Sequence, residues 1–445
     1  MAVVHYEESE QFYSDLYDEL FPILRSITGP GLRQSYDIFG RYMPLERLSI
    51  PSGTALFDWQ VPQEWHCDEA YLAGPDGERI ADIKRLNLEV VNYSEPVDKI
   101  LTLEELQPHL YSLPELPEAV PYVTSYYKKR WGFCLSQSRR EQLKPGQYRA
   151  VIKSRFVDGH LDLAKTVLEG QSDQEVLLSS YLCHPSMANN ELSGPLVLLG
   201  LYHRIKQWPN RRYTYRFMLH PETIGSLGVL HLMQDHFHQN LVSGLVLNCL
   251  GGDPQELVFK HSRNDNGLLD KLLYHLSEQG HGHSNIPFSP LSGSDERQYN
   301  APGFQFPVCC VSRSFHTGYK EYHTSLDNKD YMGIKPLLDS IDKLEKIFLA
   351  FEQSARFENT HPYGEPNLGS RDLYPTLSFF SEERTRQLDE LNHIKMLLCY
   401  SDGEHDTIDI AEKYSQSVTE FAGAINKLEA HALLKMLPLK SLMEA

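Results

Sequence analysis

A buried strand that opens into a polar loop is the feature that most narrows what this chain can fold into. The apolar run at residues 176–182 is followed by a loop that holds His184 and Glu191, and a helical pattern starts at Leu192. Continuous apolar runs of this length are typical of buried strands in a parallel sheet. Ligand sites in such sheets lie just beyond the carboxyl ends of the strands. The sequence therefore predicts a functional site at this loop, where a histidine and a carboxylate suit a metal ion.

The alternation of strand and helix continues through residue 357. Further strands are predicted at 213–219, 244–249 and 306–312, and helices at 192–208, 224–237, 267–279 and 334–357. This alternation favours an α/β fold in which helices flank a mixed, mainly parallel sheet.

Two other regions have a different sequence pattern. Residues 8–27 have helical spacing that a Pro/Gly segment at 27–31 breaks, and residues 51–159 contain short alternating segments separated by Pro and Gly. We therefore predict a core formed by residues 1–50 and 160–360 that carries a β-rich insertion at 51–159, similar to a protease-associated domain.

The sequence pattern of the C-terminal region predicts a separate folding unit. A Pro- and Gly-rich linker covers residues 361–369, helices are predicted at 392–399, 406–414 and 418–429, and a strand pair at 430–439. Three helices and a hairpin are typical of a winged helix, which we place at residues 365–445.

Composition excludes several functions. The net charge of −18 disfavours binding to nucleic acids or anionic membranes through the chain as a whole. The seven cysteines form no CxxC pair, which argues against a thiolate zinc site. The acidic N-terminus lacks an apolar signal core and no apolar run could span a bilayer, so we expect a cytoplasmic protein.

Four polar loops, at residues 184–191, 220–225, 292–297 and 322–328, lie at the ends of predicted strands, and together they suit hydrolytic metal chemistry. His184 and His323 are candidate zinc ligands, and Glu191 or Asn190 is the third. Glu222, at the start of a helix, is the candidate base that accepts a proton from water. Each residue alone also has an ordinary structural explanation, such as helix capping for Glu222 or hydrogen bonding for His184.

The third and fourth loops add candidates for substrate binding. Arg297 is placed to hold a substrate carboxylate or a developing oxyanion. Asp295, Glu296 and Tyr322 are the other candidates, although residues 295–297 could equally form a structural ion-pair cluster.

These loops resemble a bacterial family with an aminopeptidase-like domain, whose members often lie among proteins of polysaccharide or secondary-metabolite biosynthesis. The resemblance rests on PSMANNELSG, PETIGS, GSDERQY and YHTSLDN, and it extends over nearly the whole chain. It implies a zinc-exopeptidase-type core, a β-rich insertion and a C-terminal winged helix. The wider relatives are aminopeptidases with two zinc ions.

The chain departs from the two-zinc pattern in ways that bear on the cofactor. The resemblance matches His184 and His323 to metal ligands and Glu222 to the catalytic base. Asn190, however, falls where a metal-bridging aspartate is expected, Thr223 replaces a ligating glutamate, and Cys249 or Asn248 replaces an aspartate. Two crowded ions would then lack compensating negative charge, so we predict one zinc ion, with Asp295 as a reserve ligand.

Three functions remain in competition. The first is a zinc-dependent hydrolase for an amide or peptide bond in a small molecule or short peptide. The second is a catalytically inactive scaffold that binds a ligand or partner. The third is a DNA-binding regulator, which the acidic segment 418–429 disfavours because it holds one lysine and two glutamates. Homo-oligomerisation through the core or the winged helix stays open.

Overall fold

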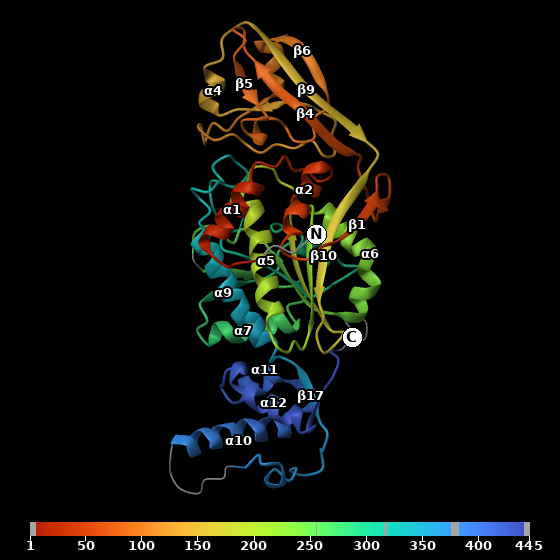
Figure 1. Cartoon of the computed structure of the whole chain (residues 1–445), viewed down its shortest axis with the longest axis vertical. Helices are drawn as coiled ribbons and strands as arrows, with labels where there is room; N and C mark the ends of the chain where they lie inside the picture. The colour runs from red at the N-terminus through yellow and green to blue at the C-terminus, as the bar shows by residue number, and fades with distance from the viewer. Residues whose placement is uncertain (1–5, 255, 316–317, 375–381, 440–445) are drawn as a thin grey trace.

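The molecule consists of three units stacked along its longest axis (Figure 1). The computed structural model describes residues 6–254, 256–315, 318–374 and 382–439, without the side chains of 383 and 384. The β-rich insertion lies at the top of the view, the α/β core in the middle and the C-terminal domain at the bottom. No helix in these described ranges is long and apolar enough to cross a bilayer.

The core is built on an eight-stranded mixed sheet, as predicted. Its order is β1-β10-β12-β11-β13-β16-β14-β15. The central strands β12, β11, β13 and β16 are parallel, and antiparallel pairing begins at β10 on one side and β14 on the other. The bounds are β1 (Glu46–Pro51), β10 (His160–Leu168), β11 (Glu175–Tyr181), β12 (Thr214–His220), β13 (Leu241–Leu247), β14 (Leu257–Lys260), β15 (His283–Ile286) and β16 (Val308–Ser312).

Helices cover both faces of this sheet because its central strands are apolar on both sides. On β11, Val176 and Leu178 enter one buried cluster and Leu177 enters the other. The first cluster also receives side chains from α1 (Glu10–Leu20), α2 (Pro30–Phe39), α5 (Ser193–Lys206), α7 (Leu268–Glu278) and α9 (Ile334–Phe351). The second is formed mainly with α6 (Ile224–Asn240) and α8 (Glu296–Tyr299).

Two helix predictions were too long. The helix predicted at 8–27 ends at Leu20, because Pro22 cannot continue it, and Pro30 then starts a second helix. The helix predicted at 334–357 ends at Phe351, because residues 356–359 form a strand.

The insertion is a twisted four-stranded sheet with the order β5-β4-β9-β6. Its longer strands are β4 (Glu64–Ala73), β5 (Arg79–Asp82), β6 (Val97–Thr102) and β9 (Gln147–Val157). Short elements complete it: β2 (Ala55–Leu56), β3 (Trp59–Gln60), η1 (Asn87–Glu89), α3 (Leu103–Leu106), η2 (Gln107–His109), β7 (Leu110–Tyr111), β8 (Phe133–Cys134) and α4 (Gln137–Glu141).

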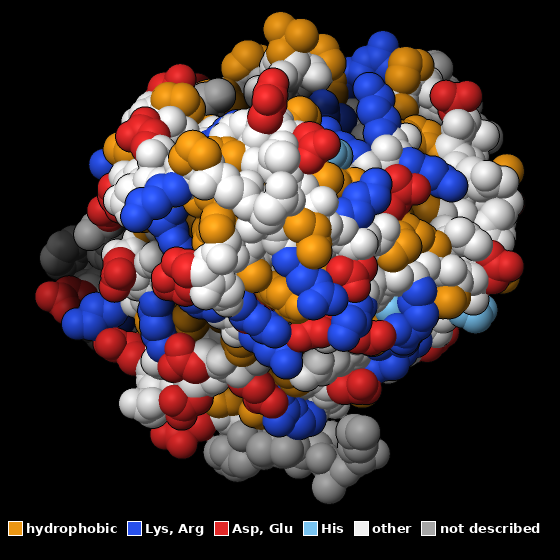
Figure 2. Space-filling model, turned by 90° about the horizontal axis from the view of Figure 1, so that it is seen from above, with side chains coloured by type: hydrophobic (Ala, Val, Ile, Leu, Met, Phe, Trp, Pro, Cys, Tyr) orange, Lys and Arg blue, Asp and Glu red, His pale blue; other side chains and the backbone are white. Residues whose placement is uncertain are grey.

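The insertion end of the molecule has a mixed charge. Figure 2 shows Lys and Arg side chains interspersed with Asp and Glu on this face. Ion pairs across neighbouring strands contribute to the pattern, such as Lys153 with Glu69 and Arg155 with Asp68 between β9 and β4. Interspersed charges of both signs favour solubility rather than binding to a polyanion.

An ion-pair cluster joins the insertion to the core and yields a pH-dependent prediction. Arg33 on α2 binds Glu64 on β4 at 2.7 Å and Asp162 on β10 at 2.9 Å. Burial raises the pKa of Glu64, but hydrogen bonds from Arg33 and the backbone N–H of His160 outweigh it and lower the pKa from 4.5 to about 2. The ionised Glu64 therefore stabilises the fold above about pH 4.5, and this stabilisation is lost as the pH falls towards 2.

We expect Glu64→Gln to lower the free energy of unfolding at neutral pH by about 1–3 kcal/mol. The difference from the wild type should shrink as the pH falls from about 4.5 to about 2. Denaturant unfolding across this range measures it, with Glu104→Gln, an exposed carboxylate on α3, as the control. A difference that does not change with pH would contradict the assignment.

The C-terminal domain contains three helices and a three-stranded sheet with the order β18-β17-β19. Its elements are β17 (Arg356–Asn359), η4 (Gly369–Arg371), α10 (Glu382–Tyr400), β18 (Asp402–Asp406), α11 (Thr407–Lys413), η5 (Val418–Phe421), α12 (Ala422–Ala430) and β19 (Leu434–Met436). The strand pair predicted at 430–439 is instead the single strand β19, which pairs with β17. The central strand of this sheet is β17, which precedes the linker. It therefore lies before residue 365, where the winged helix was predicted to begin.

The C-terminal domain docks on the core through charged contacts. Arg212, just before β12, binds Glu429 on α12 at 2.7 Å. Lys271 on α7 binds Asp406, the N-cap of α11, at 2.7 Å, and also contacts Asp409.

Candidate active site at the carboxyl ends of the central strands

The first loop begins directly after β11 and is almost fully buried. His184 follows the strand, and a short π-helix, η3 (Ala188–Leu192), carries Asn190 and Glu191. These three side chains belong to residues that are 4%, 2% and 0% exposed. π-Helical turns occur frequently at functional sites, and this one directs neighbouring polar residues into the space beside β11.

His184 lies between two carboxylates. Its Nδ1 is 2.8 Å from Glu191 Oε2, and its Nε2 is 3.5 Å from Glu222 Oε2. Burial lowers the pKa of His184, but Cys183 and Glu191 outweigh this effect and raise the pKa well above the usual range. The ring is therefore fixed in orientation, with Nδ1 towards Glu191 and Nε2 towards Glu222.

The fourth loop brings His323 next to His184. The centroids of the two rings are 5.5 Å apart. An imidazole centroid lies about 3 Å from a zinc ion bound to its nitrogen, so two rings on one tetrahedral ion stand about 5 Å apart. The spacing thus fits a shared ion. Tyr322 stacks on His323 with a centroid distance of 3.9 Å.

Asn190 presents an oxygen with no hydrogen-bond partner among the described residues. Its Nδ2 donates to the hydroxyl of Tyr181 at 2.9 Å, which fixes the amide, while its Oδ1 is buried and unbonded. A buried carbonyl oxygen without a partner costs free energy unless a ligand satisfies it. Asn190 Oδ1 is therefore the oxygen that best fits a third bond to a metal ion.

Asp327 holds this arrangement in place, and sequence reasoning gave it no role. Its two carboxylate oxygens accept hydrogen bonds from the backbone N–H groups of Asn189 and Asn190 at 2.7 and 2.8 Å. Burial raises the pKa of Asp327 to about 7. Its presence four residues after His323 was visible in the sequence, but its contact with a loop 137 residues away was not.

The second loop supplies Glu222, whose side chain is 29% exposed. Its Oε1 accepts a hydrogen bond from the hydroxyl of Ser294 at 2.7 Å. The next residue, Thr223, is the N-cap of α6 and has φ +62°, a strained value for a β-branched residue. This strain is maintained by Asp295, which accepts a hydrogen bond from the Thr223 N–H at 2.6 Å.

In the third loop, two residues that were predicted to bind substrate, Asp295 and Glu296, make contacts that support the fold. Asp295 is fully buried, and its Oδ1 also accepts from the hydroxyl of Ser226 at 3.0 Å, while burial raises its pKa to about 7. Glu296 is fully buried and pairs with Lys260. Asp295 and Glu296 therefore support the loop from inside the fold. Arg297 is half-buried and donates from Nε to the Ser294 carbonyl at 3.3 Å.

A segment of the insertion lies against the site through Tyr122, a residue that the sequence did not single out. The ring of Tyr122 lies 5.0 Å from that of His184 and 5.3 Å from that of His323. The backbone N–H of Tyr122 donates to the His323 carbonyl at 2.8 Å, and that of Ser325 donates to the Val120 carbonyl at 2.8 Å. The insertion is thus bonded to the loop that carries His323.

Backbone strain marks the same region. Four non-glycine residues with positive φ lie near the site: Ser186, Thr223, Cys249 and His323. The first three lie in the loops that follow β11, β12 and β13, and His323 lies in the fourth loop. Such conformations persist only where the surrounding structure enforces them, and they concentrate at functional sites.

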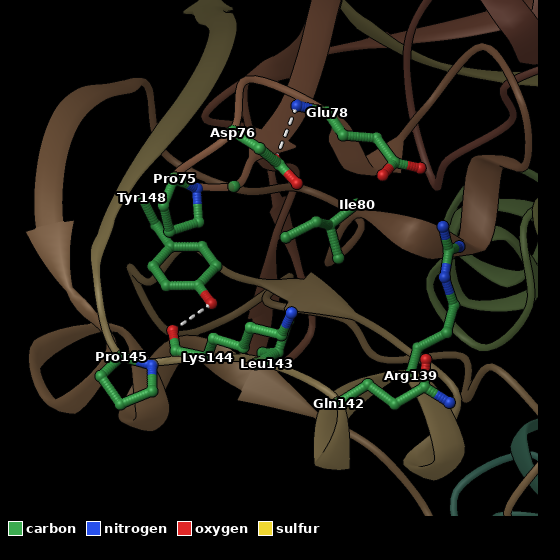
Figure 3. Close-up of a pocket in the computed structure, with 11 residues that line it drawn as sticks. Pro75, Asp76, Glu78, Ile80, Arg139, Gln142, Leu143, Lys144, Pro145 and Tyr148 are labelled. Atoms are coloured by element: carbon green, nitrogen blue, oxygen red, sulfur yellow. Dashed lines mark hydrogen bonds between the residues drawn. The ribbon is translucent and has the colours of Figure 1, made fainter.

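A separate hollow lies in the insertion but lacks this chemistry. It has a volume of about 780 Å³ and lies between the β4–β5 turn and residues 139–148. Figure 3 shows Asp76, Glu78 and Arg139 around Ile80 and the ring of Tyr148. No histidine or cysteine lines it, so we assign the chemistry to the buried site.

Sequence comparison identifies the parts of the chain. The profile of a domain of unknown function, DUF4910, matches residues 14–354, and a winged helix-turn-helix profile matches residues 355–436. A Clostridium acetobutylicum protein described as a candidate polysaccharide biosynthesis protein with an aminopeptidase-like domain is 37% identical over 423 residues, which cover 95% of each protein.

Solved structures agree with this assignment. A candidate peptidase from C. acetobutylicum is 36% identical, with 97% of both chains covered and a TM-score of 0.84. A zinc aminopeptidase from Bacillus subtilis is 12% identical over 76% of this chain and 93% of its own, with a TM-score of 0.55. A peptidase M28 precursor from Shewanella amazonensis is 11% identical over 76% of this chain and 91% of its own, with a TM-score of 0.53.

The last two likenesses show the fold alone, whereas the C. acetobutylicum matches extend over nearly the whole chain. The predicted resemblance and fold class are confirmed. The chain belongs to the DUF4910 family and combines an aminopeptidase-like α/β scaffold with a C-terminal winged helix.

Proposed function

We propose that this protein is a zinc-dependent hydrolase that cleaves an amide or peptide bond in a small molecule or short peptide. The observations that carry the proposal are the 5.5 Å spacing of the His184 and His323 rings and the buried, unbonded oxygen of Asn190, which belongs to the same loop as His184. Two imidazoles and an oxygen form a donor set that zinc prefers, and a hydrolytic site needs a fourth position for water or substrate.

The donor set supports one ion rather than two. His184 and His323 in their neutral forms and Asn190 bring no negative charge, and Glu222 is the nearest carboxylate on the Nε2 side of His184. Cys249 or Asn248 falls where the two-zinc pattern has a carboxylate. An uncharged side chain at this position does not supply the negative charge of a carboxylate, so a second divalent ion would have less counter-charge than in the two-zinc pattern.

The residues of the chain supply the remaining chemistry. A bound zinc ion would polarise the scissile carbonyl and lower the pKa of water. Glu222, held by Ser294 and partly open to solvent, accepts the proton of the attacking water and returns it to the leaving nitrogen. Tyr122 limits the entry of bulk solvent and restricts the site to substrates that are small or extended.

Metal analysis tests the proposal directly. We expect the protein purified from zinc-supplemented cultures to hold one zinc ion per chain, and His323→Ala to lose it, because two ligands bind zinc far more weakly than three. His281→Ala, an exposed histidine, is the control. A chelator should abolish hydrolysis across a panel of aminoacyl amides and short peptides, and added zinc should restore it. A metal-free protein without hydrolysis would favour the inactive scaffold.

The remaining proposals concern location and the winged helix. We place the protein in the cytoplasm, where its seven free cysteines would stay reduced. We assign the winged helix to protein contact or dimerisation rather than DNA binding, because α12 is bonded to the core through Glu429 and to α10 through Lys427. A gel shift with duplex DNA at moderate salt would reverse this assignment.

A further inference from the structure

We propose that Glu191 and Arg25 form a buried positioning pair that aims Nε2 of His184 at the metal, so that Glu191 acts through His184 and is not itself a ligand. This inference rests on the proposed function. The sequence left Asn190 and Glu191 as alternative oxygen ligands. In this proposal Asn190 binds the metal, and Glu191 instead accepts a hydrogen bond from His184.

The contact between Glu191 and His184 sets the orientation of the ring. Glu191 Oε2 lies 2.8 Å from Nδ1, and both residues are buried. A carboxylate that accepts the Nδ1–H fixes the tautomer whose lone pair is on Nε2, and it raises the basicity of that nitrogen. Nε2 faces Glu222 at 3.5 Å and is the nitrogen that this arrangement leaves for the metal. Glu191 is therefore on the opposite side of the imidazole from the metal position.

Arg25 holds Glu191 and the backbone of His184 together. It is fully buried in the segment between α1 and α2, and its Nε donates to the His184 carbonyl at 3.0 Å. The same nitrogen is 3.5 Å from Glu191 Oε1, and Nη1 donates to the Leu20 carbonyl at 2.7 Å. The guanidinium thus neutralises a carboxylate that would otherwise be buried with a full negative charge.

The position of Arg25 is itself built into the fold. Gly31 on α2 packs so closely that a Cβ there would lie 1.9 Å from the Leu24 carbonyl oxygen and 3.1 Å from the Arg25 nitrogen. The absence of a side chain at 31 allows this segment to approach α2 and to send Arg25 beneath His184.

The charge of Arg25 also decides between two conceivable metal positions. Ligand atoms of Cys183, His184 and Glu191 lie within 4.8 Å of one another, a spacing that would suit an ion on the Nδ1 side. A divalent cation there would stand beside the guanidinium, with which Glu191 is already paired. Because like charges at this range repel strongly in a buried site, the ion is directed to the Nε2 side.

The test is zinc affinity, measured by competition with a chromogenic chelator on the full chain. We expect Glu191→Gln to weaken zinc binding about 10- to 100-fold, the usual effect of removing a carboxylate behind a ligating histidine. The double variant Arg25→Met/Glu191→Gln should bind zinc as tightly as Glu191→Gln alone, because the two residues act through one histidine. Circular dichroism checks that the variants are folded.

The chain offers a matched control at the other end of the same strand. Glu175 is a buried carboxylate bonded to Arg216 at 2.6 Å and to His236 at 2.9 Å, so it has the same kinds of partner as Glu191. Glu175→Gln should leave zinc affinity unchanged.

Cobalt substitution distinguishes a positioning residue from a ligand. At saturating Co²⁺, Glu191→Gln should keep the visible absorption of the wild type, because the ligand set is the same. A changed spectrum with loss of binding would make Glu191 a ligand and overturn the inference, as would wild-type zinc affinity in Glu191→Gln. A wild type that binds no zinc would instead refute the proposed function itself.

Discussion

Replacement of Glu222 by glutamine is expected to lower kcat by about two to four orders of magnitude without removing zinc. The variant keeps a hydrogen-bond acceptor for Ser294 but loses the basic oxygen that faces Nε2 of His184. The amide oxygen cannot accept a proton from water at neutral pH, so the loss should be in kcat and not in substrate binding. Steady-state kinetics on the best amide substrate and elemental analysis measure the two quantities.

The control for this variant is Glu104→Gln, which removes an exposed carboxylate in the insertion and should leave kcat unchanged. Full activity in Glu222→Gln would refute the assignment of the base. Loss of zinc together with loss of activity would instead make Glu222 a ligand.

Replacement of Gly194 by alanine is expected to destabilise the core strongly. Gly194 is the second residue of α5, and a Cβ there would lie 2.3 Å from both the Leu247 carbonyl oxygen and the Ser180 hydroxyl. Because the Leu247 oxygen belongs to the backbone of β13, the helix must move away from the sheet. We expect a loss of about 3 kcal/mol or more in the free energy of unfolding, seen as a lower denaturation midpoint.

Gly423→Ala provides a control of opposite sign. Gly423 lies in α12, and the nearest atom to an added Cβ is Glu390 Oε1 at 3.6 Å, an ordinary contact. Alanine should stabilise this helix by up to about 1 kcal/mol, because it loses less backbone entropy than glycine on folding. Equal effects of the two substitutions would show that helix propensity, and not the close approach of α5 to the sheet, decides the cost at Gly194.

Much of the fold could be predicted because the central strands are buried on both faces. The apolar run at 176–182 differs from β11 by one residue at each end, and the helix that follows starts within one residue of its predicted position. The strand β17 was not predicted, because its four residues alternate between exposed and buried and follow a long helix without a turn signal. Its pairing with β18 and β19 depends on contacts that no local pattern reveals.

The candidate site was partly visible for the same reason. Strand ends in a parallel sheet share one edge, so His184, Glu222 and His323 could be expected to meet. The sequence could not show that Asp295 and Glu296 turn inward, because polar residues in a loop have the same pattern whether they support it or line a site. Arg25 and Tyr122 also could not be found, since Arg25 reaches the site from the segment between α1 and α2 and Tyr122 from the insertion, both far along the chain from the four loops.

The hydrogen bonds between the insertion and the fourth loop limit which residues can be deleted from this protein. Tyr122 and Val120 hold the backbone at His323 and at Ser325 through hydrogen bonds. Excision of residues 51–159 would therefore leave one histidine without its support and open its ring to water. The smallest competent unit therefore includes the insertion as well as the core, and engineered fragments should retain both parts.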